Sequence, residues 1–532
     1  MTKAKLFISF VALLVSLVIF TGCAEKCEHS YTEEILTSPT CTESGEKAYI
    51  CSECGFTYSE TVEALGHEYG DEWITDVEPT CATEGSKSHH CINCDDTTDV
   101  TSLPKNGVHN VVDGYCGRCN RKESSHGLEY KENPDGTYQV IGIGTCTDSE
   151  IVIDIFNNRD VVSIAAEAFQ YSEQITGVDI SDSVKEIGHD AFAYCTNLAN
   201  LKLGSGVKVI DRVFYDCTSL TELVIPEGVT TIRDFSFCEN LTRVVIPANL
   251  TTIHGNAYFQ SSNKLEEIIV AEGNGAYKSI DGNLYTKDGA RLLRYAPAKA
   301  ETAFTVPSSV IHIASEAFAH SKNITELIIP EGVVRIGNSC FLGCDNIVKL
   351  SIPSSIKSAT AWGITSQVIE LAEYDNAYYL GNGNEPYLIL YRAKDKNITS
   401  CTINEQTKYI YSEAFESCES LTDVDIPDSV LYVGHFAFRY CSGLTSIAFS
   451  DSLLGLFVGA FYSCHNLTSV YIPKELEYVD FFAFSNCPKL TLYCEAESDP
   501  WDVWSWHDTD ATVIFGATVE DFLAHGETGE SK

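Results

Sequence analysis

The sequence predicts an α/β repeat solenoid, preceded by a separate cysteine-rich module. The stretch "CESLTDVDIPDSVLYVGHFAFRYC" starts at Cys418, and "CSGLTSIAFSDSLLGLFVGAFYSC", which starts at Cys441, has nearly the same outline. Aromatic residues keep the same register, with 23 positions between successive members of the set Phe415, Phe438, Phe461 and Phe484. Because one such unit buries too little apolar surface to fold alone, we expect stacked units that share a continuous core.

One unit can be translated into local structure. In "CTSLTELVIPEGVTTI", Leu223 and Ile225 alternate inward from a short strand. Pro226 has no N–H to donate to a sheet, so it ends the strand. The Ala-Phe pair that follows, as in Ala191-Phe192, is expected to pack the convex side on a helical turn. This pattern, with a period of 23 residues, is typical of a leucine-rich repeat horseshoe.

Two segments interrupt the repeat. Residues 277–297 contain Asp281-Gly282, a turn signal that predicts a β-hairpin, and residues 376–404 form a second insertion of this type. A recurring cysteine occupies one repeat position beside core leucines. We interpret it as a small buried core residue rather than a disulfide ladder or a reactive array, at Cys195, Cys217 and Cys344 among others.

The N-terminus indicates an extracytoplasmic address. Lys3 and Lys5 precede an apolar run that ends at Phe20, which is the order of a secretory signal. Thr21-Gly22-Cys23 resembles a bacterial lipoprotein cleavage box, although Phe20 stands where that box usually has leucine. Ordinary signal cleavage nearby is the alternative. A lipid on Cys23 would anchor the protein to the cell membrane and display it on the cell surface.

The expected domains follow from these features. They are a lipoprotein signal peptide at 1–22, tandem Cys/His repeats at 23–126, the solenoid at 127–495, and a C-terminal cap with an acidic tail at 496–532.

The cysteine-rich module is a tandem duplication. Cys41 to Cys81, Cys51 to Cys91 and Cys54 to Cys94 are each 40 positions apart, and His29 to His67 is 38. A shortened third copy retains one histidine and a Cys-x-x-Cys pair. A tetrahedral zinc site needs four N or S donors, and each full copy offers one histidine, one lone cysteine and such a pair.

The recurrence therefore predicts three structural zinc sites. The first set is His29, Cys41, Cys51 and Cys54; the second is His67, Cys81, Cys91 and Cys94; the third is His109, Cys116, Cys119 and His126. Two alternatives stay open, since His67 could close the first site from downstream and Cys27 is a spare donor beside His29. A disulfide framework is the other interpretation that an extracytoplasmic address permits. Zinc would replace the apolar core that so small a module cannot build.

Composition excludes some functions. The 35 basic and 75 acidic side chains give a net charge of −40, which repels phosphate backbones, so we expect no nucleic-acid partner. No G-x-S-x-G, H-E-x-x-H, P-loop or dinucleotide motif is present, and we expect no enzymatic activity.

The outward side chains of the repeat strands are the expected ligand-binding face, which we place on the concave side. Their character varies from coil to coil, as a recognition surface requires. The residues are Lys202, Glu222, Val224, Arg243, Val245, Glu326, Ile328, Lys349, Asp423, Asp425 and Tyr471.

The repeat resembles the BspA-type leucine-rich repeat family of bacterial surface proteins. The motif that carries this resemblance reads "C-x-x-L-T-x-x-x-I-P-x-x-V-x-x-I-x-x-x-A-F" in the best copies, over residues 128–495. The cysteine-rich repeats are similar to zinc-ribbon-like modules of clostridial surface proteins. The resemblance implies a non-enzymatic surface lipoprotein that binds extracellular proteins and adheres to host matrix or other cells.

The alternative function is capture of an extracellular polysaccharide or peptide by a binding lipoprotein. Trp501, Trp504 and Trp506 follow the last repeat, and such aromatic clusters can stack on sugars. We favour a role in capping the exposed core of the final coil.

Overall fold

The computed structural model describes residues 28–234, 238–254, 259, 261–357, 361–498 and 511–526. The chain divides into two compact units, unit 1 up to His109 and unit 2 from Asn110 onward. The predicted lipidation site Cys23, the spare donor Cys27 and the three tryptophans at 501–506 lie outside the described residues. Within the described part of the chain, no helix has the length and apolar character needed to cross a membrane.

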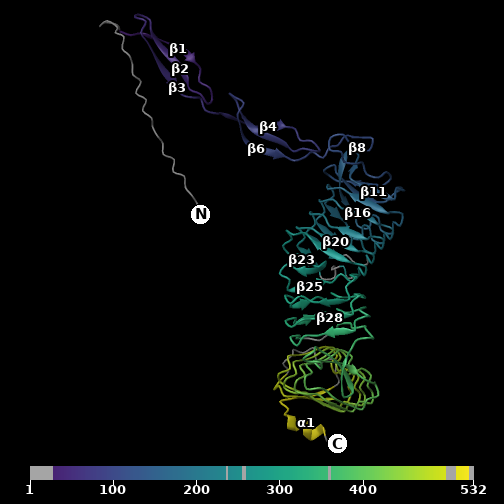
Figure 1. The fold of residues 1–532 in the computed structure, drawn as a ribbon. Helices are drawn as coiled ribbons and strands as arrows, with labels where there is room; N and C mark the ends of the chain where they lie inside the picture. The colour runs from purple at the N-terminus through teal and green to yellow at the C-terminus, as the bar shows by residue number, and fades with distance from the viewer. Residues whose placement is uncertain are drawn as a thin grey trace. The chain divides into compact units, whose positions relative to one another are not determined.

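Unit 1 consists of two three-stranded antiparallel sheets, which we call module 1 and module 2 (Figure 1). In each sheet the second strand along the chain lies between the other two. Little apolar surface is buried, and every residue of the first strand of module 1 is exposed. The strands of module 1 are β1 (Tyr31–Thr37), β2 (Gly45–Cys51) and β3 (Thr57–Val62); those of module 2 are β4 (Tyr69–Val77), β5 (Gly85–Cys91) and β6 (Thr97–Leu103).

Unit 2 is a β-solenoid whose coils stack one on another (Figure 1). Most coils give one strand to each of two parallel ladders. The first ladder contains β11 (Glu150–Ile153), β14 (Gly177–Ile180), β16 (Asn200–Lys202), β18 (Glu222–Val224), β20 (Arg243–Ile246), β22 (Glu267–Val270), β26 (Ala303–Thr305), β28 (Glu326–Ile328), β30 (Lys349–Ser351), β34 (Ser400–Thr402), β36 (Asp423–Asp425), β38 (Ser446–Ala448), β40 (Ser469–Ile472), β42 (Thr491–Cys494) and β43 (Thr512–Phe515).

The second ladder lies further along each coil. It contains β13 (Arg159–Ile164), β15 (Glu186–Ile187), β17 (Val209–Asp211), β19 (Thr231–Asp234), β21 (Thr252–Ile253), β25 (Arg291–Arg294), β27 (His312–Ile313), β29 (Arg335–Ile336), β33 (Ile389–Ala393), β35 (Tyr409–Ile410), β37 (Tyr432–Val433), β39 (Gly455–Leu456) and β41 (Tyr478–Val479).

The remaining strands begin the solenoid or belong to its insertions. The start is formed by β7 (Val111–Val112), β8 (Tyr115–Cys116), β9 (Glu129–Glu132), β10 (Tyr138–Gly142) and β12 (Ile155–Phe156). The insertions contribute β23 (Tyr277–Ile280), β24 (Asn283–Thr286), β31 (Ala372–Tyr374) and β32 (Ala377–Leu380), which pair antiparallel and join the second ladder. At the predicted turn, Asp281 and Gly282 both take positive φ, as a tight hairpin requires.

The alternation of apolar residues explains the strands of the first ladder. In β18 the side chain of Leu223 is buried, whereas those of Glu222 and Val224 on either side are exposed. Behind the strands, phenylalanines from successive coils stack face to face. The ring centroids of Phe415 and Phe438 are 5.0 Å apart, and those of Phe438 and Phe461 are 4.9 Å apart.

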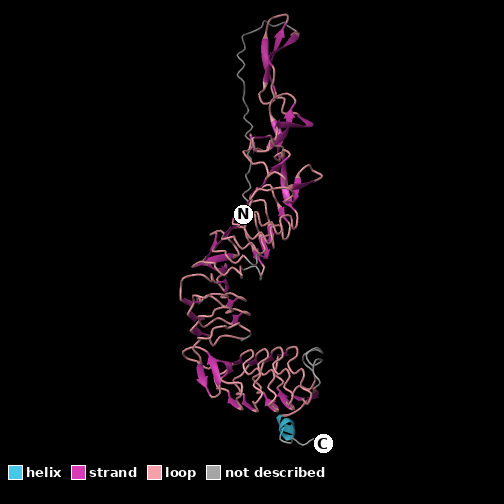
Figure 2. Ribbon diagram, turned by 90° about the vertical axis from the view of Figure 1, so that its right-hand side faces the viewer, coloured by secondary structure: helices cyan, strands magenta, loops and turns pink. Residues whose placement is uncertain are grey.

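The expected helical turn at the Ala-Phe pair does not form in the described coils, which consist of strands and turns (Figure 2). Two residues of such a turn take positive φ, for example Phe436 and Tyr440, and this left-handed conformation is incompatible with an α-helix. The one helix described, α1 (Val519–Gly526), follows the last strand. The solenoid is therefore a β-solenoid with little helix, rather than an α/β one.

The recurring cysteine is a buried core residue, as predicted. Cys441 is fully buried, and its Sγ lies 3.1 Å from the carbonyl oxygen of Phe415 in the preceding coil. The same contact recurs at Cys195, Cys217, Cys344, Cys464 and Cys487. Burial raises the pKa of Cys195 to about 12, so the thiol is neutral and can donate this weak hydrogen bond at pH 7.

Both ladders are interrupted between β30 and β33, where the second insertion begins. The core nevertheless continues through this break. Trp362 is fully buried, and its backbone N–H donates to the Tyr411 hydroxyl at 2.8 Å. Tyr409 donates from its hydroxyl to the carbonyl of Ile356 at 2.5 Å. These contacts join the coils on the two sides of the break.

Candidate metal clusters and binding face

Each Cys-x-x-Cys pair of unit 1 sits on a tight turn between the second and third strands of its module. The backbone N–H of Cys51 donates to the carbonyl of Phe56 at 2.8 Å, and that of Cys91 donates to Asp96 at 2.9 Å. In both modules, this turn brings the second cysteine of the pair back beside the first. The histidine of each module stands just before the first strand, near the same turn.

The lone cysteine is at the other end of its module. Cys41 precedes β2, whereas Cys51 is the last residue of that strand. Seven extended residues at about 3.3 Å each separate the two by roughly 20 Å, which is too far for a shared ion. The structure therefore corrects the predicted grouping of Cys41 with His29, Cys51 and Cys54.

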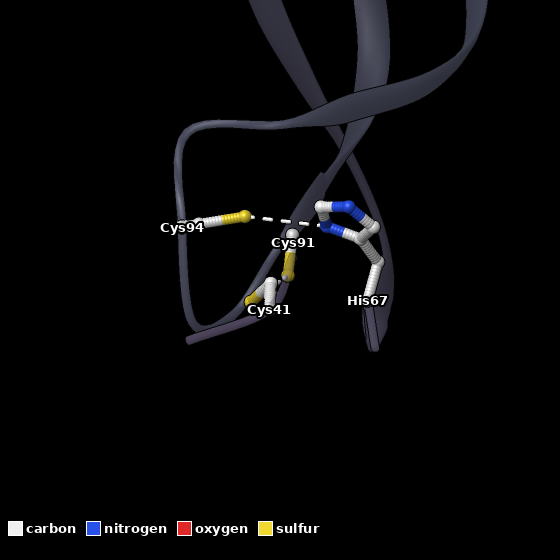
Figure 3. Close-up of side chains that lie close together, drawn as sticks. All are labelled: Cys41, His67, Cys91 and Cys94. Carbon is white, nitrogen blue, oxygen red and sulfur yellow. Dashed lines mark hydrogen bonds between the residues drawn. The ribbon is translucent and has the colours of Figure 1, made fainter. Parts of the chain in front are cut away.

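Cys41 instead lies with His67, Cys91 and Cys94 of module 2, whose side chains gather around one point (Figure 3). The linker between the modules holds it there, because the N–H of Gly66 donates to the carbonyl of Cys41 at 3.1 Å. Of the alternative in which His67 closes the first site from downstream, the structure bears out only the proximity of His67 to Cys41, because Cys51 and Cys54 lie with His29. Cys81, which we had grouped with His67, is not part of the cluster.

The four donor atoms lie within 4.8 Å of one another. The Sγ atoms of Cys41 and Cys91 are 3.8 Å apart, and the Sγ of Cys94 is 3.3 Å from Nδ1 of His67. A tetrahedron with Zn–S bonds of about 2.3 Å and Zn–N bonds of about 2.05 Å has edges of about 3.8 Å and about 3.5 Å. The cluster could hold a metal such as zinc.

The thiols of this cluster have strongly perturbed acidities. Hydrogen bonds, first of all from the backbone N–H of Asn93, lower the pKa of Cys91 to about 6. Burial, together with the neighbouring Cys94 and Cys91, raises the pKa of Cys41 to about 12. Three thiolates at such short range repel one another, and a divalent cation among them removes that penalty.

The first module has a cluster of three donors, His29, Cys51 and Cys54. Nδ1 of His29 is 3.3 Å from Sγ of Cys51 and 3.4 Å from Sγ of Cys54. The hydrogen bond with His29 is the main cause that lowers the pKa of Cys51 to about 6. These three residues are the part of the first predicted set that the structure brings together.

The third predicted set comprises His109, the last residue of unit 1, and Cys116, Cys119 and His126 of unit 2. Cys116 opens a turn of the same kind, because its N–H donates to the carbonyl of Arg121 at 2.8 Å. His126 is exposed and joins no group of potential ligands among the described residues.

The predicted binding face is the outward side of the first ladder. Two hollows lie on it. One, of about 410 Å³, is lined by Lys202, Glu222 and Val224 among others. The other, of about 400 Å³, is lined by Glu326, Ile328 and Lys349 among others. Val224 is 52% exposed and Ile328 is 38% exposed, so both present apolar surface in these hollows.

Charged residues of this face pair across strands. Arg243 lies in register between Glu222 and Glu267 and forms ion pairs with both. Val245 beside it is half-buried. Further along, Asp423 and Asp425 are exposed on β36.

Tyr471 does not belong to the accessible face, and its assignment was wrong. Its side chain is 4% exposed and packs against Phe522 of α1, with ring centroids 6.1 Å apart. Strand β43 extends the first ladder by pairing with β42, and the helix then folds back over β40 and β42. Within the described residues, this strand and helix cover the core of the last coils.

The sequence reasoning missed a row of basic side chains on the second ladder, at Arg291, His312 and Arg335. Their repeat position could have revealed this row, because they are 21 and 23 residues apart and each directly precedes a buried core residue. They line a cavity of about 610 Å³ together with residues from distant coils, including His435, Phe457 and Tyr478.

Comparison with known proteins identifies the repeat. The BspA type leucine-rich repeat region is matched in six copies over residues 162–286, 298–365 and 391–496, more than half of the chain. No curated protein matches the chain.

Solved structures of bacterial leucine-rich repeat proteins are similar. One from Eubacterium ventriosum is 21% identical, with 72% of this chain and 97% of that chain covered and a TM-score of 0.44. The pneumococcal vaccine antigen PcpA is 17% identical, with 74% and 98% covered and a TM-score of 0.41. A leucine-rich cell surface protein from Faecalibacterium prausnitzii is 19% identical, with 77% and 99% covered and a TM-score of 0.31.

Proposed function

Because this chain belongs to the BspA-type leucine-rich repeat family, we propose that it is a non-enzymatic cell-surface lipoprotein that binds extracellular proteins through the outward face of its first ladder. The proposed ligands are host matrix proteins or surface proteins of other cells. The signal-like N-terminus and Cys23 support the surface address and the lipid anchor.

The observation that carries the proposal is the character of this face. Parallel strands hold their outward side chains in fixed rows, and the rows change from coil to coil between charged, small and apolar residues. The two hollows combine an exposed apolar side chain with charged neighbours, at Val224 and at Ile328. Buried apolar anchors surrounded by polar groups are the usual organisation of protein interfaces.

The features of unit 1 support a role as a spacer that presents the solenoid away from the anchor. Its modules bury hardly any apolar side chains, and we propose that zinc at the cluster of Cys41, His67, Cys91 and Cys94 supplies the missing stability. Four protein ligands would leave no open position for a substrate, so the ion would be structural. Modules of this kind would act as spacers between the anchor and the solenoid.

The test is binding of the purified protein to immobilised matrix proteins before and after single substitutions. Val224→Asp and Ile328→Asp each place a charge where an apolar contact is expected, and we predict that at least one weakens binding about tenfold or more. Leu342→Asp is the matched control, because Leu342 is 39% exposed but lies on a turn away from the first ladder. Binding that is lost equally with Leu342→Asp, or with none of the three, contradicts the assignment of this face.

A further inference from the structure

The second ladder has a basic row that its own chain does not neutralise. Arg291 on β25 is the register partner of His312 on β27, which in turn is the partner of Arg335 on β29. All three side chains are exposed. Neighbouring strands are about 4.8 Å apart, so the row holds the two arginines roughly 10 Å apart with a histidine between them.

On the first ladder, an arginine with a structural role is paired with carboxylates of both neighbouring strands. Arg243 has a glutamate as register partner on each side and pairs with both. By contrast, the guanidinium groups of Arg291 and Arg335 form no ion pair with a carboxylate anywhere in the described residues. In a chain with a net charge of −40, these two arginines stand in one row without a carboxylate partner among the described residues, so their charge is available to an external anion.

The row forms one wall of a cavity, and the other wall comes from coils more than 95 residues later. The cavity lies between coils on the two sides of the break after β30, which the contacts of Trp362 with Tyr411 join. Ser315 and Asn338 add polar groups to the basic wall. A volume of about 610 Å³ suits a small ligand or a short piece of a polymer.

Aromatic side chains dominate the facing wall. The ring of Phe457 is 5.0 Å from that of His435 and 5.4 Å from that of Tyr478, measured between centroids. Gly455 makes room for this cluster, because a Cβ there would lie 2.4 Å from the ring of Tyr478. Asp480 is the carboxylate that lines the cavity, near His435.

We propose that this cavity binds an acidic polysaccharide segment. A guanidinium recognises a carboxylate through two parallel hydrogen bonds, and two guanidinium groups separated by one strand match carboxylates repeated along a polymer. The aromatic wall offers flat apolar surface to the rings of sugars. An acidic peptide fits less well, because the deep apolar residues Ile313 and Ile336 are already buried in the core and leave no pockets for apolar side chains. This site lies on the second ladder and is independent of the proposed protein-binding face.

The experiment measures binding of oligogalacturonate to the purified protein by calorimetry at low and moderate salt. We expect binding that weakens as salt increases, and a loss of about tenfold in affinity for Arg291→Gln and for Arg335→Gln. Arg335→Lys should restore only part of the affinity, since an ammonium cannot make the paired hydrogen bonds. Arg159→Gln is the matched control, because Arg159 is exposed on β13 of the same ladder but does not line the cavity, and it should bind as the unmodified protein does.

Two further ligands distinguish recognition of the carboxylate charge from recognition of the sugar polymer. The methyl ester of the same oligosaccharide keeps the sugar rings but lacks the carboxylates, and it should bind at least about tenfold more weakly. Equal binding of the ester, absence of any oligogalacturonate binding, or tighter binding of an oligoglutamate peptide that depends on the same arginines would each overturn the proposal. Circular dichroism of each variant checks that these exposed substitutions leave the fold intact.

Discussion

Phe438→Ala is expected to destabilise the C-terminal coils by about 3–5 kcal/mol, the usual cost of removing a fully buried aromatic ring. Phe438 is completely buried, and its ring stacks on Phe415 from one neighbouring coil and on Phe461 from the other. In a solenoid each coil gains its stability from its two neighbours, so the cavity weakens two interfaces at once. Urea unfolding followed by circular dichroism measures the change.

Phe481→Ala is the control for that experiment. Phe481 is 54% exposed and belongs to the turn of a later coil, so its removal creates no cavity. We expect a change within about 0.5 kcal/mol. If the two variants lost similar stability, the phenylalanine stack would not be the element that holds successive coils together.

Cys41→Ser is expected to remove one bound zinc ion per chain and to loosen both modules of unit 1. The reason is the position of Cys41, which belongs to module 1 but lies with His67, Cys91 and Cys94 of module 2. Because the two sheets bury little apolar surface, loss of the ion should also expose them to proteolysis. Elemental analysis of the purified variant gives the metal content, and Cys418→Ser, a buried cysteine of the solenoid, should leave it unchanged.

Double substitutions distinguish the observed grouping from a grouping within each module. If Cys41 and Cys91 serve the same ion, the variant with both Cys41→Ser and Cys91→Ser loses no more zinc than either single variant. If Cys41 and Cys51 serve different clusters, combining Cys41→Ser with Cys51→Ser removes an additional ion. The reverse pattern would mean that each module closes its own site.

The repeat and its core could be predicted from the sequence because they depend on local spacing. Leu223 and Ile225 alternate inward, and Asp281-Gly282 forms the turn of a hairpin, as their order in the chain requires. The convex turn could not be predicted in this way. An Ala-Phe pair is compatible with a helix, and only the positive φ of residues such as Phe436 and Tyr440 excludes one.

The candidate sites could not be fully predicted, because they depend on distances in the folded protein that the spacing of residues in the sequence does not determine. The separation of ten positions between Cys41 and Cys51 would fit a hairpin around one ion, but most of the intervening residues belong to the extended strand β2, and Cys41 lies with the ligands of the next module. Tyr471 has the repeat position of an exposed residue, and it is buried because α1 folds back over it. The cavity at Arg291 and Arg335 is also lined by residues of much later coils, such as His435, and local spacing does not reveal that these coils lie near one another.

The most direct test of the proposed binding face is hydroxyl-radical footprinting of the protein with and without a bound matrix protein. The proposal predicts that oxidation of Val224 or Ile328 decreases in the complex, while oxidation of Leu342 stays the same. Unchanged oxidation of both Val224 and Ile328 in a saturated complex would contradict it and would locate the partner away from the first ladder.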